Sequence, residues 1–140
     1  MKILVPVDGS ETSLRALKHA LELVKAFSKP GKLTVVAVDD ALFPGAERKI
    51  GADAVREHHA ENFARMFAPA KKALARSKAN VAFTEVVDDI ASGILKAAHK
   101  EKSDLIVMGS RGAGGIKGTL LGSVSMKVLA SSPVPVTIVR

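Results

Sequence analysis

The sequence predicts a single α/β domain whose strands form a parallel β-sheet with helices on both faces. Short apolar runs alternate with helical patterns along all 140 residues, which is typical of a parallel sheet. The run Leu105–Met108 is continuously apolar, as expected of a strand that is buried on both sides. No repeat, low-complexity tract or linker divides the chain, so we expect one domain over residues 1–140.

The first third of the chain predicts a strand, a helix and a second strand. The first strand covers Ile3–Val7, with Pro6 near its end because proline donates no ladder hydrogen bond. Ser10 can cap the helix that follows. Four apolar residues then recur at three- and four-residue spacing, as on one face of a helix: Leu14, Leu17, Leu21 and Val24. The helix should end at Pro30-Gly31, before a strand over 33–38.

The middle of the chain predicts a loop, a long helix and a third strand. Residues 39–51 contain one proline and two glycines and indicate an irregular loop. Residues 53–77 are mostly good helix formers, although Pro69 should kink or split this helix. The mostly apolar run over 81–87 predicts the third strand.

The last third predicts two more helices and two more strands. The first helix carries Ile90, Ile94, Leu95 and Ala98 on its apolar positions. The fourth strand is Leu105–Met108, a short helix runs from about Gly122 to Ala130, and the last strand covers Val134–Val139. Pro135 removes one ladder donor, which favours an edge position or the start of a strand.

Composition limits the classes of function. The chain has no cysteine, so disulfides and thiolate chemistry are excluded. Its formal net charge of +7 allows anionic partners, but the basic residues are dispersed and no aromatic residues lie among them. We therefore do not expect nucleic acid as a partner. No signal-peptide pattern and no apolar run of about 20 residues occurs, so we expect a cytoplasmic protein with no membrane attachment.

Acidic residues and glycines follow the predicted strands. Asp8-Gly9-Ser10 follows the first strand, Asp39-Asp40 the second and Asp88-Asp89 the third, while a glycine-rich stretch over 109–125 follows the fourth. In open parallel sheets, ligands bind beyond the carboxyl ends of the strands where the order of connection reverses. These residues should therefore gather on one ligand-binding rim.

The stretch 109-GSRGAGGIKGTLLGSVS-125 contains six glycines between a strand and a helix. Glycines let a phosphate approach the backbone, and the N-terminus of a helix offers free N–H groups, to which Ser123 and Ser125 can add hydroxyl donors. The stretch is neither a Walker A motif nor a dinucleotide fingerprint. On these grounds alone it is either a phosphate site or a flexible surface loop. Arg111 and Lys117 either pair with phosphate or stay solvated, with Lys117 preferred as the phosphate partner.

The spacing of the glycines in this stretch is a more specific signal than their number. Gly109-x-x-Gly112, a gap of nine residues and then Gly122-Ser123 resemble the ATP-binding signature of the universal stress protein family. The start, 3-ILVPVDGSETSLRALKHA-20, resembles the first strand and helix of that family, and 133-PVPVTIV-139 resembles its last strand. The resemblance covers essentially the whole chain.

This resemblance implies a Rossmann-like, doubly wound sheet of five strands in the order 3-2-1-4-5, with helices on both faces. It implies that Asp8 lies near the ribose and phosphates of ATP, often with a divalent ion such as Mg²⁺. Val38 would contact adenine through its backbone, and Met108 would border the pocket. The expected nucleotide-binding set is Pro6, Val7, Asp8, Val38, Met108, Gly109, Arg111, Gly112, Gly122, Ser123, Val124 and Ser125.

Three features depart from the family pattern or have a simpler interpretation. Many family members carry glycine after the third strand, where Asp88 or Asp89 stands here, and an acid there could repel phosphate unless a cation intervenes. Asp39-Asp40 are interpreted as turn residues. His58-His59 are adjacent, and adjacent residues of a helix do not face each other, so we do not expect them to form a metal site.

Two functions from different classes follow. The leading one is an ATP-binding, or adenine-nucleotide-binding, protein that acts as a nucleotide-dependent regulator or in the stress response. The alternative is a slow ATPase or phosphotransferase that uses the same site, for which a base is needed near the γ-phosphate. Its candidates are Asp8, Asp39, Asp88 and Asp89, but none lies in a recognisable hydrolytic motif.

The last strand also predicts an assembly. Its apolar residues Val134, Val136, Ile138 and Val139 end the chain, and an edge strand leaves backbone groups unpaired. We therefore expect a homodimer through the C-terminal strand, in agreement with what the family resemblance implies.

Overall fold

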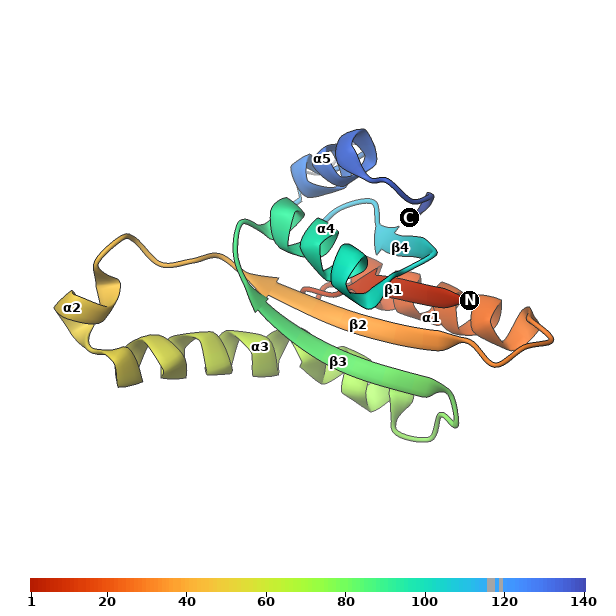
Figure 1. Cartoon of the computed structure of the whole chain (residues 1–140), viewed down its shortest axis with the longest axis horizontal. Helices are drawn as coiled ribbons and strands as arrows, with labels where there is room; N and C mark the ends of the chain where they lie inside the picture. The colour runs from red at the N-terminus through yellow and green to blue at the C-terminus, as the bar shows by residue number, and fades with distance from the viewer. Residues whose placement is uncertain (116–117, 119) are drawn as a thin grey trace.

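The computed structural model describes residues 1–115, 118 and 120–140, and it contains one all-parallel sheet of five strands in the order β3-β2-β1-β4-β5 (Figure 1). The elements are β1 (Lys2–Pro6), α1 (Glu11–Ala26), β2 (Lys32–Asp39), α2 (Ala46–Ile50), α3 (Ala52–Leu74), β3 (Asn80–Val87), α4 (Ile90–Glu101), β4 (Leu105–Gly109), α5 (Ser123–Ser131) and β5 (Val136–Val139). The predicted fold class and strand order are confirmed.

The strand order reverses at β1, which lies in the centre of the sheet. The chain moves outward from β1 through β2 to β3, and then returns to place β4 on the other side of β1. Ile3 is paired with Leu33 of β2 and with Leu105 of β4. Because parallel connections have one hand, this reversal places helices on both faces of the sheet.

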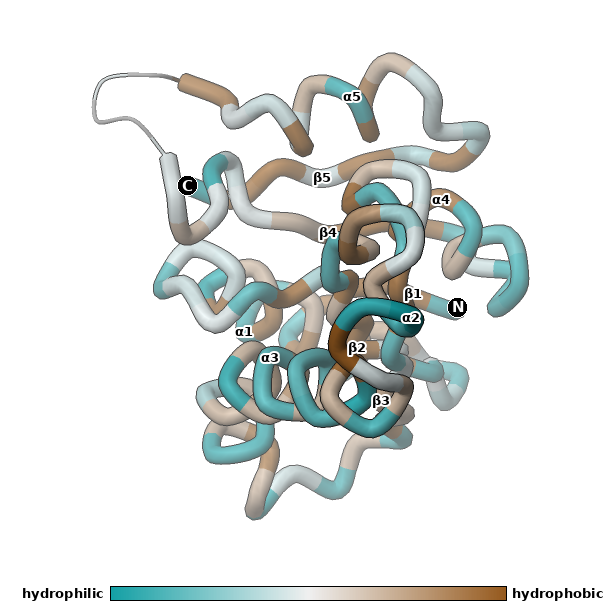
Figure 2. The backbone as a smooth tube through the Cα atoms, turned by 90° about the vertical axis from the view of Figure 1, so that its left-hand side faces the viewer, coloured by the Kyte–Doolittle hydropathy of each residue, from teal (hydrophilic) through white to brown (hydrophobic). Residues whose placement is uncertain are grey.

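Two separate apolar cores result, one on each face of the sheet. Ile3 and Val5 pack with buried residues of α1 and α3. Leu4, between them in the sequence, packs on the opposite face with residues of α4 and with Val128 of α5. Figure 2 shows α1 and α3 on one side of the strands and α4 on the other. The alternation arises because successive side chains of a strand point to opposite faces.

The cap and the apolar face of α1 largely follow the prediction. The Ser10 hydroxyl accepts a hydrogen bond from the Ser13 N–H at 3.2 Å and caps α1 as expected. Leu17 and Leu21 are buried under this helix. Two prolines also lie where predicted: Pro6 ends β1, and Pro135 directly precedes β5, an edge strand of the sheet.

Between β2 and β3, the structure departs from two predictions. The expected irregular loop contains the short helix α2. Of the two effects expected of Pro69, a kink or a split, the split does not occur, because α3 runs unbroken from Ala52 to Leu74. Phe67 and Ala70 are both buried against the sheet, so packing on either side of Pro69 holds the helix together. The Arg65 carbonyl, which loses its usual N–H partner because of Pro69, lies beside Gly9 in the turn after β1. Figure 1 shows α2 and the start of α3 extending beyond the sheet.

Candidate functional site

A cavity of about 560 Å³ opens at the carboxyl ends of β1, β2 and β4, where the strand order reverses. Its volume is in the range of small-molecule and cofactor sites. All twelve residues of the set predicted from the sequence line it: Pro6, Val7, Asp8, Val38, Met108, Gly109, Arg111, Gly112, Gly122, Ser123, Val124 and Ser125. The fold therefore brings together residues from four separate parts of the chain.

Asp8 joins the two loops that border the cavity. Its Oδ1 accepts a hydrogen bond from the Ser10 N–H at 2.9 Å, and its Oδ2 accepts one from the Ala113 N–H at 2.8 Å. The carboxylate thus ties the turn after β1 to the glycine-rich loop after β4. Since each carboxylate oxygen has two lone pairs, Asp8 keeps acceptor capacity for a cation or a ligand hydroxyl.

At two glycines of the signature, any side chain would make a close contact with a neighbouring segment. A Cβ added at Gly112 would lie 2.8 Å from Asp8 Oδ2, and one added at Gly109 would lie 3.0 Å from the backbone of Thr12. By contrast, a Cβ at Gly114 would meet no atom of the described residues within 4 Å. The glycines at 109 and 112 therefore allow the backbone of the loop to press against the turn after β1 and against α1.

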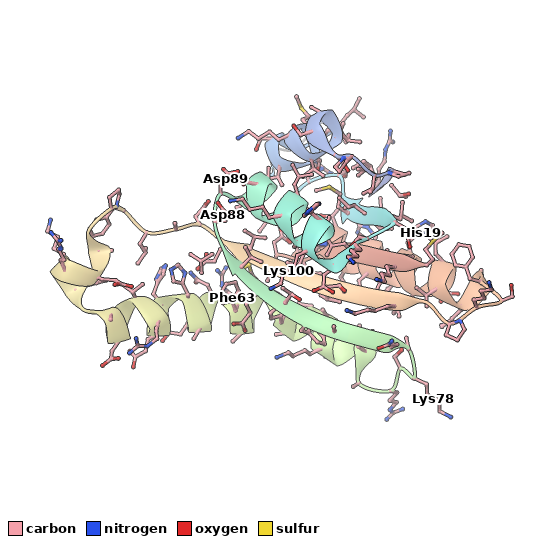
Figure 3. All side chains as sticks on the ribbon, viewed as in Figure 1. His19, Phe63, Lys78, Asp88, Asp89 and Lys100 are labelled. Atoms are coloured by element: carbon pink, nitrogen blue, oxygen red, sulfur yellow. The ribbon has the colours of Figure 1, made fainter. Side chains whose placement is uncertain are left out.

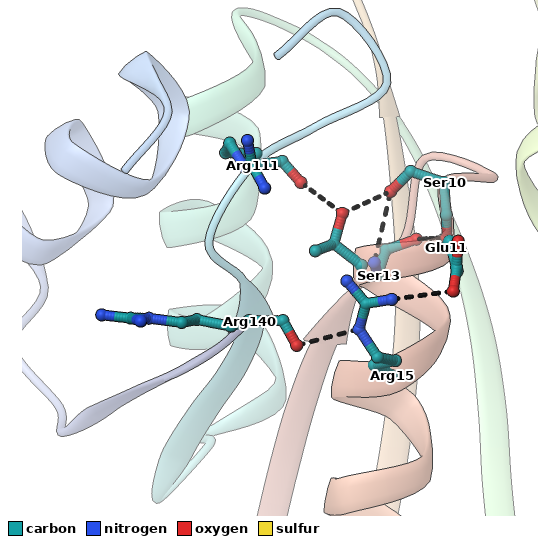
Figure 4. A network of polar contacts seen from close by, with 7 residues as sticks. Ser10, Glu11, Ser13, Arg15, Arg111 and Arg140 are labelled. Atoms are coloured by element: carbon teal, nitrogen blue, oxygen red, sulfur yellow. Dashed lines mark hydrogen bonds and ion pairs between the residues drawn. The ribbon is translucent and has the colours of Figure 1, made fainter. Parts of the chain in front are cut away.

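The start of α1 holds the glycine-rich loop and the C-terminus in place. The Thr12 hydroxyl donates to the Arg111 carbonyl at 2.9 Å, and Arg15 Nε donates to the Arg140 carbonyl at 2.8 Å. Figure 4 shows both contacts, together with the ion pair between Arg15 and Glu11. One helix end thereby fixes the chain on both sides of α5.

The N-terminus of α5 faces the cavity. The Gly122 carbonyl accepts the first helical hydrogen bond, from Met126, so the N–H groups of the residues between them have no partner within the helix. Ser123, the first residue of α5, lines the cavity, and there is no acidic residue in the first turn. N–H groups without a partner in the helix and the positive end of the helix dipole make this a favourable position for an anion.

Ser125 has a different role from the one expected. Its side chain is buried, and its hydroxyl lies 2.9 Å from the Gly109 carbonyl and 3.1 Å from the Ser110 carbonyl, to which it donates. The hydroxyl therefore closes the loop against α5 and is not a free donor for phosphate.

The two acids after β3, Asp88 and Asp89, lie at the turn between β3 and α4 (Figure 3). Asp88 accepts a hydrogen bond from Lys96 Nζ at 2.6 Å, and this contact holds the pKa of the Asp88 carboxyl below its usual value. Asp89 caps α4 by accepting the Ser92 N–H at 3.0 Å. Neither residue lines the cavity. Their positions therefore give no reason to expect that they repel a phosphate bound in it.

The interpretation of Asp39 as a turn residue is wrong. Asp39 is the last residue of β2, and its Oδ2 lies 2.6 Å from His59 Nδ1 and 2.9 Å from Asn62 Nδ2. Burial acts to raise the pKa of the Asp39 carboxyl, but hydrogen bonds from Asn62 and His59 outweigh it and hold the pKa below its usual value. The residue that ends β2 is thus anchored to α3.

The expectation that the adjacent residues His58 and His59 do not face each other is also wrong. Their ring centroids are 5.2 Å apart in an edge-to-face arrangement. Both rings also approach the same group of side chains, because Asn62 Nδ2 lies 3.2 Å from His58 Nε2 and also contacts Asp39. Neighbouring residues of one helix therefore converge on a common partner at the end of β2.

The sequence did not identify the part of the cavity that α3 and α4 provide. Arg65 and Met66 line it from α3, and Ile90 and Ile94 line it from α4. The four-residue spacing of the two isoleucines indicated an apolar helical face, but nothing local indicated that this face reaches the cavity. Lys117, the preferred phosphate partner, lies outside the described residues.

An open parallel α/β sheet with a glycine-lined cavity at its switch point defines the class of this protein: doubly wound proteins that hold a ligand where the strand order reverses. In the described part of the chain, no helix is both long enough and apolar enough to cross a membrane.

Comparison with known proteins identifies the family. The model of the universal stress protein family matches residues 1–140, and the chain belongs to this family. It is similar to universal stress protein MJ0531 of Methanocaldococcus jannaschii, with 34% identity over 99% of this chain and 81% of the relative. Universal stress protein YxiE of Bacillus subtilis is 32% identical, over 99% of this chain and 98% of the relative.

Solved structures agree with this assignment. The structure of MJ0577 of M. jannaschii has a TM-score of 0.83 and 32% identity, covering 99% of this chain and 94% of that chain. A universal stress protein crystallised in complex with cAMP has a TM-score of 0.72 and 26% identity, covering 100% of this chain and 97% of that chain. The family predicted from the sequence is confirmed.

Proposed function

We propose that this protein binds an adenine nucleotide, with ATP as the leading candidate, and acts as a nucleotide-dependent regulatory protein of the stress response. One observation carries the proposal: the twelve residues predicted from the sequence line a single cavity, where a glycine-rich backbone meets the N-terminus of a helix. Loop, helix end and cavity supply the contacts that a phosphate chain needs.

The two sides of the cavity suit the two ends of a nucleotide. Phosphates would lie against Gly112 and the N-terminus of α5, where backbone N–H groups are available. The base would lie against an apolar side formed by Val38, Ile90, Ile94 and Met108, which all belong to one cluster. An apolar surface for the ring with a few polar groups for orientation is the usual composition of such sites.

The relatives support the same ligand class. The universal stress protein solved in complex with cAMP is 26% identical to this chain over its whole length, and cAMP is an adenine nucleotide. ATP and cAMP share the adenine base and the ribose and differ in the phosphate. The glycine-rich side of the cavity, where the phosphates would lie, would therefore decide which of the two binds more tightly.

The contacts of the four candidate bases favour binding over rapid hydrolysis. Each of the four candidate bases already has a partner: Asp8 accepts two N–H groups, Asp39 contacts His59, Asp88 contacts Lys96, and Asp89 caps α4. We therefore propose that phosphate release, if measured, is slower than about 1 per second, the lower end of ordinary enzyme turnover. For Mg²⁺, Asp8 is the residue whose remaining lone pairs would bind the ion beside the phosphates.

Calorimetry and mass spectrometry test the nucleotide proposal. Protein purified without denaturant should retain an adenine nucleotide that mass spectrometry identifies. Protein freed of that ligand should bind ATP saturably, and GTP more weakly, because we propose that the backbone of Val38 contacts the adenine edge. The absence of saturable binding for ATP, ADP, AMP and cAMP, in protein with native circular dichroism, would refute the proposal.

We also propose a homodimer that pairs β5 with the β5 of a second copy. β5 lies at the sheet edge, and the carbonyls of Pro135 and Val139 bond inward to β4, so the backbone groups of Val136 and Ile138 point outward. Both side chains pack on the core beneath α4 and α5, so lysine at either position would also disturb the fold. Val136→Pro removes one outward N–H and should lower the dimer fraction in light scattering. A monomer for the unmodified protein at micromolar concentration would exclude this assembly.

A further inference from the structure

Four polar side chains meet where α3 passes the end of β2, beside the cavity. Asp39 Oδ2 lies 2.6 Å from His59 Nδ1 and 2.9 Å from Asn62 Nδ2, and Asn62 Nδ2 lies 3.2 Å from His58 Nε2. Asn62 follows His58 by four residues, so the two side chains lie one helical turn apart on the same face. The group is therefore continuous, with each member in contact with at least one other.

The spacing of these side chains suits a bound metal ion. One ligand atom each from Asp39, His58 and His59 lies within 4.8 Å of the other two. Metal–ligand bonds of about 2.0–2.2 Å place neighbouring ligand atoms about 3–4 Å apart, so small side-chain rotations bring all three atoms around one ion. The Asn62 amide lies between them. Turning it over gives up the hydrogen bond that Oδ1 accepts from Arg65 Nη2 at 3.2 Å and presents Oδ1 as a fourth ligand atom.

Two of the candidate ligands are held in place by packing, and the third is open to solvent. The His59 residue is only 9% exposed, and the Asp39 side chain is 15% exposed, so their positions are set by packing between α3 and β2. His58 is exposed and gives an ion access from solvent. Phe63 packs beside the His59 ring on the inner side, with the ring centroids 6.4 Å apart.

We propose that Asp39, His58 and His59, with Asn62 as a fourth ligand, bind one divalent transition-metal ion of the zinc class. Two imidazole nitrogens with a carboxylate and an amide oxygen suit Zn²⁺ or Co²⁺, whereas Mg²⁺ prefers oxygen ligands alone. The ion would connect α3 to the end of β2, directly after Val38 in the sequence. It is distinct from the Mg²⁺ expected beside Asp8, which would accompany the phosphates.

The competing explanation is a hydrogen-bonded network with no ion. In that case the four side chains only fasten α3 to β2, and added metal should neither bind at this position nor stabilise the fold. The two explanations differ in a quantity that can be measured without any nucleotide, so the outcome is independent of the proposed nucleotide function.

Cobalt absorption and zinc competition provide the test. Protein that carries no affinity tag and no nucleotide is titrated with Co²⁺, and Zn²⁺ is then competed against a chromogenic chelator. We expect one ion per chain, visible d–d bands on Co²⁺ binding, and their loss when Zn²⁺ displaces Co²⁺. His58→Gln, an exposed position where the fold should be kept, is expected to weaken Zn²⁺ binding at least about 10-fold.

The matched control is His19→Gln, an exposed histidine on α1, which should leave Zn²⁺ affinity unchanged. A second measurement is thermal unfolding: Zn²⁺ should raise the melting temperature of the unmodified protein and of His19→Gln, and raise it less in His58→Gln. No cobalt bands, equal Zn²⁺ affinity in His58→Gln and the unmodified protein, or an equal thermal shift in both would overturn the proposal.

Discussion

The two sides of the cavity are built in different ways. On the glycine-rich side, side chains bond to backbone: Asp8 accepts the Ala113 N–H, and Thr12 donates to the Arg111 carbonyl. On the α3 side, side chains bond to one another, as Asp39 does with His59 and Asn62. A contact with the backbone fixes the path of the chain, whereas a contact between side chains can be removed one group at a time. The two sides should therefore respond differently to substitution.

The largest expected effect is at Gly109. Gly109→Ala would place a Cβ 3.0 Å from the backbone of Thr12, and neither backbone segment can yield easily in a buried strand end. We expect the free energy of unfolding to fall by about 1–3 kcal/mol, as for other overpacked sites, together with weaker nucleotide binding. Urea unfolding measures the first quantity and calorimetry the second.

Gly114→Ala is the control for this prediction, because within the part of the chain that the structure describes the added Cβ meets no atom within 4 Å. Its unfolding free energy should stay within about 0.5 kcal/mol of the unmodified protein. Equal losses in Gly109→Ala and Gly114→Ala would mean that the close approach to α1 does not constrain this loop.

The next largest effect is expected at Gly112. The Cβ of Gly112→Ala would lie 2.8 Å from Asp8 Oδ2, which is the end of a side chain and can move, at the expense of its bond to the Ala113 N–H. The loss should therefore be about 1 kcal/mol, close to that of one hydrogen bond. A double-mutant cycle checks the cause: Gly112→Ala should cost little more in a protein that already carries Asp8→Ala, and full additivity would contradict this explanation.

On the α3 side, Asn62→Ala should have a smaller effect than Gly109→Ala. It removes one of the two side-chain hydrogen bonds to Asp39 and leaves the one from His59 in place. We expect a loss of about 0.5–1.5 kcal/mol in unfolding free energy, measured with a chelator present so that no metal contributes. Glu61→Ala, at an exposed neighbouring position, is the control and should be close to neutral. A loss greater than that of Gly109→Ala would reverse the comparison between the two sides.

The smallest effect is expected at the end of β3. Lys96→Met removes the cation that lowers the pKa of Asp88, so this pKa should rise toward its usual value. Because the folded pKa lies below the unfolded one, the pair stabilises the protein at higher pH, and its contribution is lost as the pH falls through the folded pKa, below about pH 4. An NMR titration of the carboxyl carbons would detect the change. Lys100→Met on the same helix should leave the Asp88 midpoint where it is, and an unmoved midpoint in Lys96→Met would show that Lys96 is not the cause.

Several features of the fold were predictable because their causes are local. Strand and helix alternate with clear periodicity, Ser10 caps α1, and Pro135 directly precedes an edge strand, each from residues that are close in sequence. The glycine spacing after β4 was similarly informative, since the residues that it pointed to line one cavity. The continuity of α3 through Pro69 was not predictable, because burial of Phe67 and Ala70 against the sheet outweighs the local cost of the proline.

The sequence by itself determined the class of fold, the family and the residues of the glycine-rich side, because periodicity, turn residues and motif spacing act over short stretches of chain. Only the tertiary structure decided that Asp39 meets His59 and Asn62, and that Arg65 reaches the cavity. The two contacts of Asp39 join residues that are 20 and 23 positions apart, and they depend on how α3 crosses the end of β2. That arrangement is set by the packing of whole side-chain surfaces against the sheet, which no local pattern encodes.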